Sequence, residues 1–212
     1  MQKLEEFFLQ FKPALYKKGE TILRAGDFPQ GVLFLKKGYV RLFSVSEDGK
    51  ELTLVIYKPG EFFPVVWTFF GGKPSVYYFE ALTACELIKV QREKFLGFIT
   101  RDVDVFTYVA KHIITRFQIA LQRMEYLAFG NSSSKLASIL LICAKEYGKE
   151  GSLEPEIDIP LTHKDIANLV GVTRETISIE LKKFERKGLV GRHGRHIVIK
   201  NKRQLAREAI LL

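Results

Sequence analysis

The sequence lacks the features that mark membrane, secreted and disulfide-stabilised proteins. No apolar run in its 212 residues approaches the roughly 20 residues that a membrane helix requires. Residues 1–12 mix acidic and aromatic side chains, unlike the basic-then-apolar pattern of a secretory signal. The chain has only two cysteines, which lie far apart, so a disulfide framework is not expected. These absences predict a cytoplasmic location and no membrane partner.

Patterns for catalysis and metal binding are missing as well. We find no paired carboxylates, Gly-rich phosphate loop, metal-ligand cluster or nucleophile–base arrangement with suitable spacing. His163 near Asp165 fits a surface pair in the first turn of a helix. Cys85 falls in an apparent strand and Cys143 on an apolar helical stretch, so both are expected in the core rather than as redox sensors. We therefore expect no enzyme activity and no metal site.

Positive charge is present in excess and is concentrated at one end of the chain. The formal net charge is +9. Residues 159–212 hold 12 Lys and Arg against 5 Asp and Glu, whereas residues 1–158 hold 21 against 19. The last quarter therefore carries most of the excess, as expected of a module that faces a polyanion. A solvated basic surface without a partner is the alternative.

Short β-branched and aromatic runs alternate with turn signals over roughly the first half of the chain, and each of these turns contains a glycine. Strands this short and regularly spaced are typical of a compact antiparallel barrel or roll. No helix longer than one or two turns fits before about Arg92. The expected strands are Thr21–Leu23, Val32–Leu35, Tyr39–Ser44, Leu52–Tyr57, Tyr77–Ala81 and Glu86–Val90.

The hydrophobic period changes at Val103. Apolar residues then recur at alternating spacings of three and four up to Leu127, without an intervening Gly or Pro. This heptad pattern predicts a long helix that pairs with a second copy in a coiled coil. An amphipathic helix lying on its own barrel is the alternative, and both can hold together. The expected dimer seam consists of Phe106, Ala110, Ile113, Phe117, Ala120, Met124 and Leu127.

Two further helices separated by a tight turn are expected near the C-terminus. Residues 130–134 end the long helix and offer caps for the next one, Lys135–Tyr147, after which a loop, Gly148–Ile157, follows. Thr162 can cap a helix that has Asp165 at its third position. Gly171 then supplies a tight turn.

The second of these helices is expected to begin at Arg174, after a cap at Thr173. Its apolar residues Ile177, Leu181 and Phe184 fall on one side at helical spacing. Beyond Gly188, a short basic hairpin forms around His193-Gly194-Arg195. Helix, turn, helix and hairpin together predict a winged helix-turn-helix, the hairpin at residues 189–199 being the wing.

The exposed residues of this unit have the chemistry needed to bind duplex DNA. A helix fits the major groove, where Arg174 can donate two hydrogen bonds to guanine and Glu175 can accept one from cytosine. Ordinary surface positions are the alternative for both residues. The expected phosphate contacts are Lys164, Thr173, Thr176, Lys182, His193 and Arg195, together with backbone amides at the helix start.

The segment LTHKDIANLVGVTRETISIELKKFERKGLVGRHGRHIVI resembles the DNA-binding domain of the CRP/FNR family. KKGETILRAGD, LKKGYVRLF, KPGEFF and ALTACELIKV resemble that family's β-roll sensor domain, so the resemblance covers nearly the whole chain. It implies an α+β protein with a β-roll over residues 1–100, a dimerisation helix over 101–130 and a winged helix-turn-helix over 131–212.

The resemblance also assigns base-reading residues. It gives Arg174 and Glu175 the role of the family's base-reading pair, and Ser178 matches a base-reading serine of the FNR-like branch. Ile179 stands where both branches usually have an arginine, and its apolar side chain can touch a thymine methyl group. The target half-site should therefore be related to, and different from, the usual family sequences.

The residues argue against a cyclic nucleotide as effector. The family's nucleotide binders hold the phosphate with an arginine followed by serine or threonine, and the matching stretch, residues 73–77, has no arginine. Their purine-contacting Thr-Ser pair is matched by Ala120 and Leu121. One chain cannot supply four cysteines to an iron–sulfur cluster, and His112 or Met124 as haem ligands fit better as surface or seam residues.

Aromatic residues crowd the region where relatives bind their effector. A self-filled core is one interpretation, and a pocket for an apolar or aromatic small molecule is the other. The candidate pocket residues are Glu61, Phe62, Phe63, Trp67, Tyr77, Ala120, Leu121 and Met124.

The whole pattern predicts a homodimeric transcription regulator that reads a palindromic DNA site under the control of an effector. RNA polymerase is an expected partner if the protein is an activator. A β-roll sensor or adaptor that acts on a protein partner is the alternative, and it leaves the basic wing unexplained.

Overall fold

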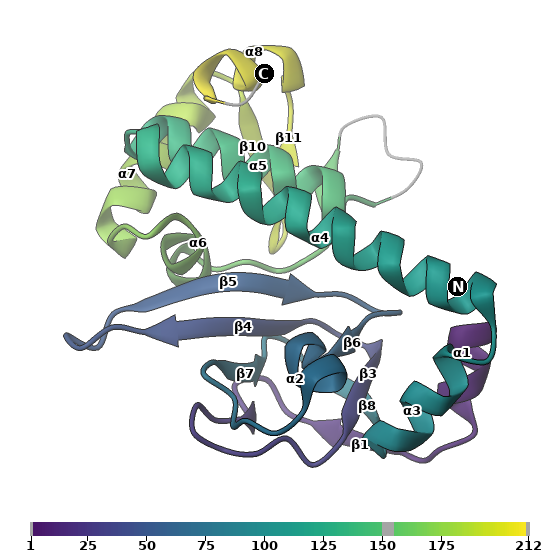
Figure 1. Ribbon diagram of the computed structural model, residues 1–212. Helices are drawn as coiled ribbons and strands as arrows, with labels where there is room; N and C mark the ends of the chain where they lie inside the picture. The colour runs from purple at the N-terminus through teal and green to yellow at the C-terminus, as the bar shows by residue number, and fades with distance from the viewer. Residues whose placement is uncertain (1, 150–154, 211–212) are drawn as a thin grey trace. The chain divides into compact units, whose positions relative to one another are not determined.

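The computed structural model describes residues 2–149 and 155–210. These divide into two compact units, 1–116 and 117–212, and the division falls inside the long helix (Figure 1). The sequence suggested three segments with the helix as a separate one. That three-segment division stays a prediction, and side chains of the long helix are buried in both units. Within the described residues, no helix is long and apolar enough to cross a membrane.

The N-terminal unit is a β-roll made of two antiparallel four-stranded sheets. One has the order β1-β8-β3-β6 and the other β2-β7-β4-β5. Strands β4 and β5 form a hairpin that pairs Val40 with Tyr57 and Val45 with Glu51 (Figure 1). The strands are β1 (Pro13–Tyr16), β2 (Thr21–Leu23), β3 (Val32–Lys37), β4 (Val40–Val45), β5 (Glu51–Tyr57), β6 (Phe62–Phe63), β7 (Tyr78–Ala81) and β8 (Cys85–Val90).

The core of this unit follows from the alternation of side chains along its strands. In β3, Val32 and Phe34 join one apolar cluster, whereas Leu33 and Leu35 join a second, so the strand is buried on both faces. The first cluster is completed by helices α1 (Gln2–Leu9), α3 (Arg92–Ile99) and the start of α4 (Val103–Phe129). A short helix, α2 (Val65–Phe70), follows β6.

The six expected strands are present, each within a residue or two of its expected bounds. Strands β1 and β6 and helices α1, α2 and α3 are additional. The expectation of no long helix before Arg92 is confirmed, since α1 has 8 residues and α2 has 6.

Helix α4 begins where Asp102 accepts hydrogen bonds from the backbone N–H groups of Asp104, at 2.9 Å, and Val105, at 3.2 Å. Lys3 pairs with the same carboxylate at 2.6 Å and lowers the pKa of Asp102. The helix runs unbroken for 27 residues, as its sequence without Gly or Pro predicted.

The C-terminal unit is a helical domain with a small antiparallel sheet of order β10-β11-β9. Its elements after α4 are α5 (Ser132–Tyr147), β9 (Glu156–Ile157), α6 (His163–Val170), α7 (Arg174–Arg186), β10 (Val190–His193), β11 (His196–Ile199) and α8 (Lys202–Glu208). Helix α5 starts three residues earlier than expected because Asn131 caps it, accepting a hydrogen bond from the backbone N–H of Ser134 at 2.9 Å. The middle of the expected 148–157 loop lies outside the described residues.

Candidate nucleic-acid interface

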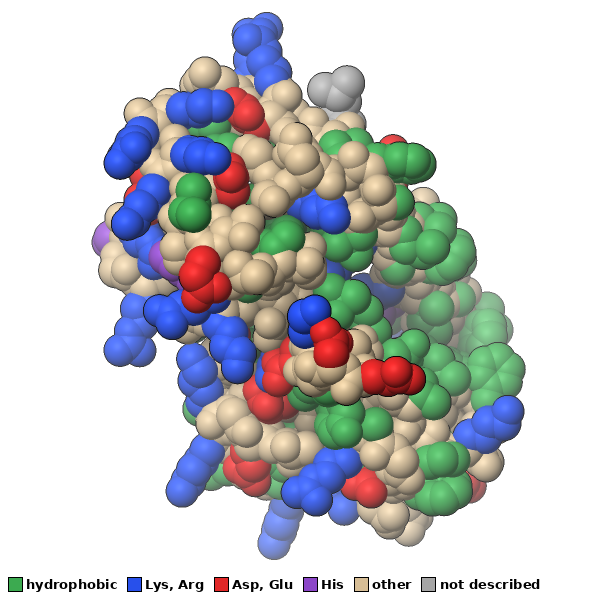
Figure 2. Space-filling model, turned by 90° about the vertical axis from the view of Figure 1, so that its left-hand side faces the viewer, with side chains coloured by type: hydrophobic (Ala, Val, Ile, Leu, Met, Phe, Trp, Pro, Cys, Tyr) green, Lys and Arg blue, Asp and Glu red, His purple; other side chains and the backbone are tan. Residues whose placement is uncertain are grey.

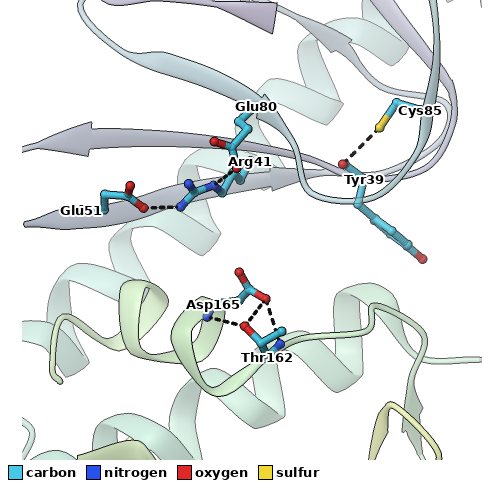
Figure 3. Close-up of polar contacts among 7 residues, drawn as sticks. All are labelled: Tyr39, Arg41, Glu51, Glu80, Cys85, Thr162 and Asp165. Atoms are coloured by element: carbon cyan, nitrogen blue, oxygen red, sulfur yellow. Dashed lines mark hydrogen bonds and ion pairs between the residues drawn. The ribbon is translucent and has the colours of Figure 1, made fainter. Parts of the chain in front are cut away.

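The turn between α6 and α7 is fixed by two capped helix starts. Thr162 and Asp165 form a reciprocal capping box at α6, in which each side chain accepts from the other's backbone N–H, at 3.2 and 2.8 Å (Figure 3). Thr173 caps α7 by accepting from the N–H of Thr176 at 3.2 Å. Gly171 ends α6 with φ 74° and ψ 37°, a left-handed conformation that glycine adopts without strain. The expected helix–turn–helix is therefore confirmed, with its caps.

Helix α7 divides into a buried and an exposed side. Ile177, Leu181 and Phe184 are buried, as their spacing predicted. The opposite side carries the expected base-reading residues. Arg174, Glu175 and Ile179 are exposed, whereas Ser178 is half-buried.

The expected phosphate-binding residues all lie in this unit, on α6, on α7 or in the wing. Thr176 is half-buried, and Lys164, Thr173, Lys182, His193 and Arg195 are exposed. Figure 2 shows Lys and Arg side chains crowded over one side of the unit. The wing is the β10–β11 hairpin, which pairs His193 with His196 and turns at Gly194. Most of these residues are exposed on two helices and a hairpin of one small unit, an arrangement that suits contact with a DNA backbone.

Sequence reasoning missed the contacts of three residues in this unit, namely His163, Arg192 and Arg123. His163 was expected to be a surface pair with Asp165. Instead, its Nδ1 lies 2.7 Å from the hydroxyl of Ser178 and its Nε2 contacts the guanidinium of Arg192. Arg123, from the end of α4, is buried and donates hydrogen bonds to Tyr126 Oη at 3.0 Å and to the carbonyl oxygen of Leu169 at 2.9 Å. Apart from the bond between Arg123 and Tyr126, which are neighbours on the helix, these contacts join residues 15 to 46 positions apart, so no local sequence pattern predicts them.

The long helix is buried within the chain on one side, and much of its expected dimer seam is uncovered. Val105 and Val109 are buried in the core of the β-roll, while Tyr126 is buried in the C-terminal unit. Most of the expected seam is left uncovered within the chain: Phe106, Phe117, Ala120 and Met124 are exposed, and Ala110, Ile113 and Leu127 are half-buried. Dimerisation through this seam stays a prediction.

A second polar site lies in the N-terminal unit, around Glu61. Its side chain is 3% exposed, accepts a hydrogen bond from the backbone N–H of Lys58 at 2.9 Å, and forms an ion pair with Arg116 of α4. His112, one helical turn earlier, lies 3.3 Å from the same carboxylate. A buried carboxylate is costly unless it is paired, and here the long helix supplies the partners.

Comparisons with known proteins agree with this architecture. The family model of the cyclic nucleotide-binding domain matches residues 14–102, and that of the Crp-like helix-turn-helix domain matches residues 134–208. The cAMP-activated global transcriptional regulator CRP of Pasteurella multocida is 29% identical over 185 residues, which cover 87% of this chain and 88% of the relative. The chain belongs to the CRP/FNR family of transcription regulators.

Other relatives extend the comparison. The global nitrogen regulator of a Nostoc species is 27% identical over 194 residues, covering 91% of this chain and 87% of the relative. FixK2 from Bradyrhizobium japonicum has the same fold, with a TM-score of 0.81 at 22% identity over 95% of this chain and 98% of that one. A CRP/FNR-family regulator from Thermus thermophilus gives 0.72 at 25% identity, covering 93% and 98%.

In CRP/FNR terms, the C-terminal unit is a helix-turn-helix DNA-binding domain, and the β-roll is the domain related to cyclic-nucleotide binding. The expected effector residues do not form one set within a unit. Phe62 packs on Phe95 in one apolar cluster, and Phe63 stacks on Phe79 in the other, as a self-filled core would have it. Trp67 is half-buried and Tyr77 is exposed.

The remaining expected effector residues, Ala120, Leu121 and Met124, are exposed and belong to the C-terminal unit. Met124 is thus in a different unit from His112, the other haem-ligand candidate. Among the described residues, no group of three or more His, Cys, Asp or Glu side chains is placed to hold a metal ion.

Both cysteines are unpaired and buried, as expected. The thiol of Cys85 lies 3.2 Å from the carbonyl oxygen of Tyr39 (Figure 3), and burial raises its pKa. Burial raises the pKa of Cys143 to about 12. Neither thiol has the lowered pKa that marks a reactive cysteine.

Proposed function

We propose that this CRP/FNR-family protein is a homodimer that binds a palindromic DNA site through two copies of α7 and is controlled by an effector at the β-roll. Arg174 and Glu175 read base edges, assisted by Ser178 and Ile179. Lys164, Thr173, Thr176, Lys182, His193 and Arg195 hold phosphates. We place the protein in the cytoplasm and, if it activates transcription, in contact with RNA polymerase.

The observation that carries this proposal is the exposure of Arg174 and Glu175 in the first turn of α7. Thr173 caps the start of the helix, and the opposite side of the helix packs into the core. The fold therefore does not depend on these two side chains. Arginine offers a bidentate pair of donors to guanine, and glutamate an acceptor to cytosine, so the pair matches a G·C-containing step in the major groove.

The uncovered seam of α4 supports the dimer. Its exposed apolar residues are spaced for knobs-into-holes packing against a second copy of the same helix. A two-fold axis along this helix generates a second recognition helix, and the two engage a palindrome when they lie about one turn of DNA, roughly 34 Å, apart.

The contacts of Glu61 with Arg116 and His112 couple the proposed effector site to the long helix. An effector that binds near Glu61 has to exchange with, or add to, the contacts of Arg116 and His112. Since both partners are on α4, any such exchange alters what holds the helix to the β-roll. The effector thereby shifts the protein between two conformations. These differ in the position of the dimer seam and in their affinity for the effector.

Selection of bound duplexes from random DNA, followed by anisotropy titrations, tests the proposal. The wild-type protein should enrich a two-fold symmetric sequence, and its affinity should fall steeply with salt as counterions are released. The double substitution Arg174→Ala, Glu175→Ala should abolish the sequence preference, because each good base contact contributes about 1–3 kcal/mol of discrimination.

The matched control is Lys202→Ala, which removes one exposed charge of α8 outside the proposed contact set. It should leave the selected sequence unchanged. Protection of an asymmetric single half-site by a monomer, or unchanged selectivity in the double variant, would contradict the proposal. An adaptor without DNA-binding function would show no salt-dependent affinity at all.

A further inference from the structure

A chain of hydrogen bonds connects the wing to the start of the recognition helix. Arg192 in β10 contacts Nε2 of His163, and Nδ1 of His163 lies 2.7 Å from Ser178 Oγ. The Ser178 hydroxyl in turn donates to the backbone carbonyl of Arg174 at 3.0 Å. The links therefore run across three elements, β10, α6 and α7.

The direction of these hydrogen bonds follows from the donors available. A guanidinium group can only donate, so Nε2 of His163 must accept from Arg192. The proton of a neutral imidazole is then on Nδ1, which donates to the Ser178 oxygen. Since the Ser178 hydroxyl donates to the Arg174 carbonyl, the oxygen keeps only an acceptor site for a further partner.

The charges around His163 favour its neutral form. Arg192 approaches from β10, while Arg174, Lys182 and Glu185 face it from α7. Burial and the neighbouring arginines lower the pKa of His163 below its ordinary value of 6.5, with Glu185 opposing them. Glu185 also lies 3.6 Å from Nε of Arg192, so the wing arginine is bound on two sides.

We propose that His163 is a positioning residue for DNA specificity, because its neutral imidazole locks the wing to the recognition helix and makes Ser178 an acceptor toward the bases. This inference rests on the proposed DNA-binding function. It predicts that Ser178 favours base pairs that offer an amino group in the major groove, namely adenine N6 or cytosine N4.

Acidification should break the hydrogen bond between Arg192 and Nε2 of His163. Once Nε2 is protonated it cannot accept from Arg192, and two cations then lie side by side. Because the pKa of His163 is lowered, the contact is fully present above pH 6.5 and is lost as the pH falls below it. The loss concerns specificity, since the added positive charge helps non-specific attraction to phosphates.

The test measures affinity for the selected duplex and for a scrambled duplex between pH 5.5 and 8.0 at fixed salt. In the wild type, the ratio of the two affinities should be constant from pH 7 to 8 and fall about tenfold toward pH 5.5, the size of one lost charge-assisted hydrogen bond. His163→Ala should show the low ratio at every pH. His163→Gln, which keeps an uncharged acceptor, should recover part of the ratio and lose the pH dependence.

Lys164→Ala, the neighbouring charge on α6, is the matched control. It should weaken both duplexes equally and keep the wild-type pH profile. A His163→Ala variant with the full ratio and an unchanged pH profile overturns this inference and leaves the proposed function intact. A wild type without any sequence preference at pH 8 instead overturns the proposed function, and this inference with it.

Discussion

Two arginine side chains, Arg41 and Arg123, are among the buried charged groups of this protein. Arg41 on β4 is 7% exposed and pairs with Glu51 at 2.6 Å and Glu80 at 2.9 Å (Figure 3). Its guanidinium also lies over the ring of Phe43. Arg123 instead satisfies a backbone carbonyl at the end of α6. A planar guanidinium with five donors suits both tasks, and lysine would not replace it.

The cysteines supply a prediction at this scale. With a pKa of about 12, Cys143 has on the order of one thiolate in ten thousand molecules at pH 8, and burial shields Cys85 as well. The native protein should therefore react with Ellman's reagent at a negligible rate, whereas protein unfolded in guanidinium should release two equivalents. Rapid reaction of one thiol in the native state would show that it is accessible.

Single residues differ in how far their sequence position reveals their role. Arg174 and Glu175 could be proposed as base-reading residues because a helix start, a cap and a chemical pairing rule all act locally. The contacts of His163 could not be predicted, because its partners Ser178 and Arg192 become neighbours only after α6, α7 and the wing have packed. Ser178 was assigned to base reading, and the structure adds that its proton is already engaged.

At the scale of elements, strongly patterned segments were predictable and weakly patterned ones were not. The turns at Gly38 and Gly49 separate β3, β4 and β5, so the bounds of these strands could be predicted closely. Strand β1 is largely exposed and β6 has only two residues, so neither carries an alternating pattern. Helix α1 was missed because its eight residues give only two buried positions, Leu4 and Phe8.

The α6–α7 turn allows a prediction about an element. Gly171→Ala puts a β-carbon into a left-handed conformation, which costs about 1–2 kcal/mol. Urea denaturation should show a loss of that size in the free energy of unfolding. Gly171→Asn should lose less, because asparagine tolerates this conformation best among the other residues. Equal losses for the two variants would point to crowding rather than backbone strain.

For the whole molecule, the heptad pattern indicated a long helix and the basic C-terminus indicated a separate module. Neither pattern indicated the boundary between the two compact units. The pattern 103–127 marks one helix and cannot tell which of its residues are buried in which unit. The structure divides the chain at 116/117 because Val105 and Val109 complete the first core, whereas Arg123 and Tyr126 are buried in the second unit. Such a division depends on packing partners far away in the sequence.

The dimer is the prediction at this scale. Phe117 is 62% exposed within the chain and lies at the middle of the seam. Phe117→Glu should raise the dimer dissociation constant by about 100-fold or more, since two buried phenylalanines are replaced by two facing charges. Light scattering coupled to size exclusion should detect monomers, and Gln118→Glu, an exposed neighbour off the seam, should remain dimeric. A dimeric Phe117→Glu variant would place the interface elsewhere.

The two shielded thiols also make the protein a convenient host for spectroscopic labels. Any cysteine introduced at an exposed position, such as Lys183 on α7, would be the one thiol that a maleimide dye reaches in the native state. A symmetric pair of subunits would then carry one dye on each recognition helix. Energy transfer between the dyes would report the separation of the two helices directly, and compounds could be screened for effectors by the change in that signal.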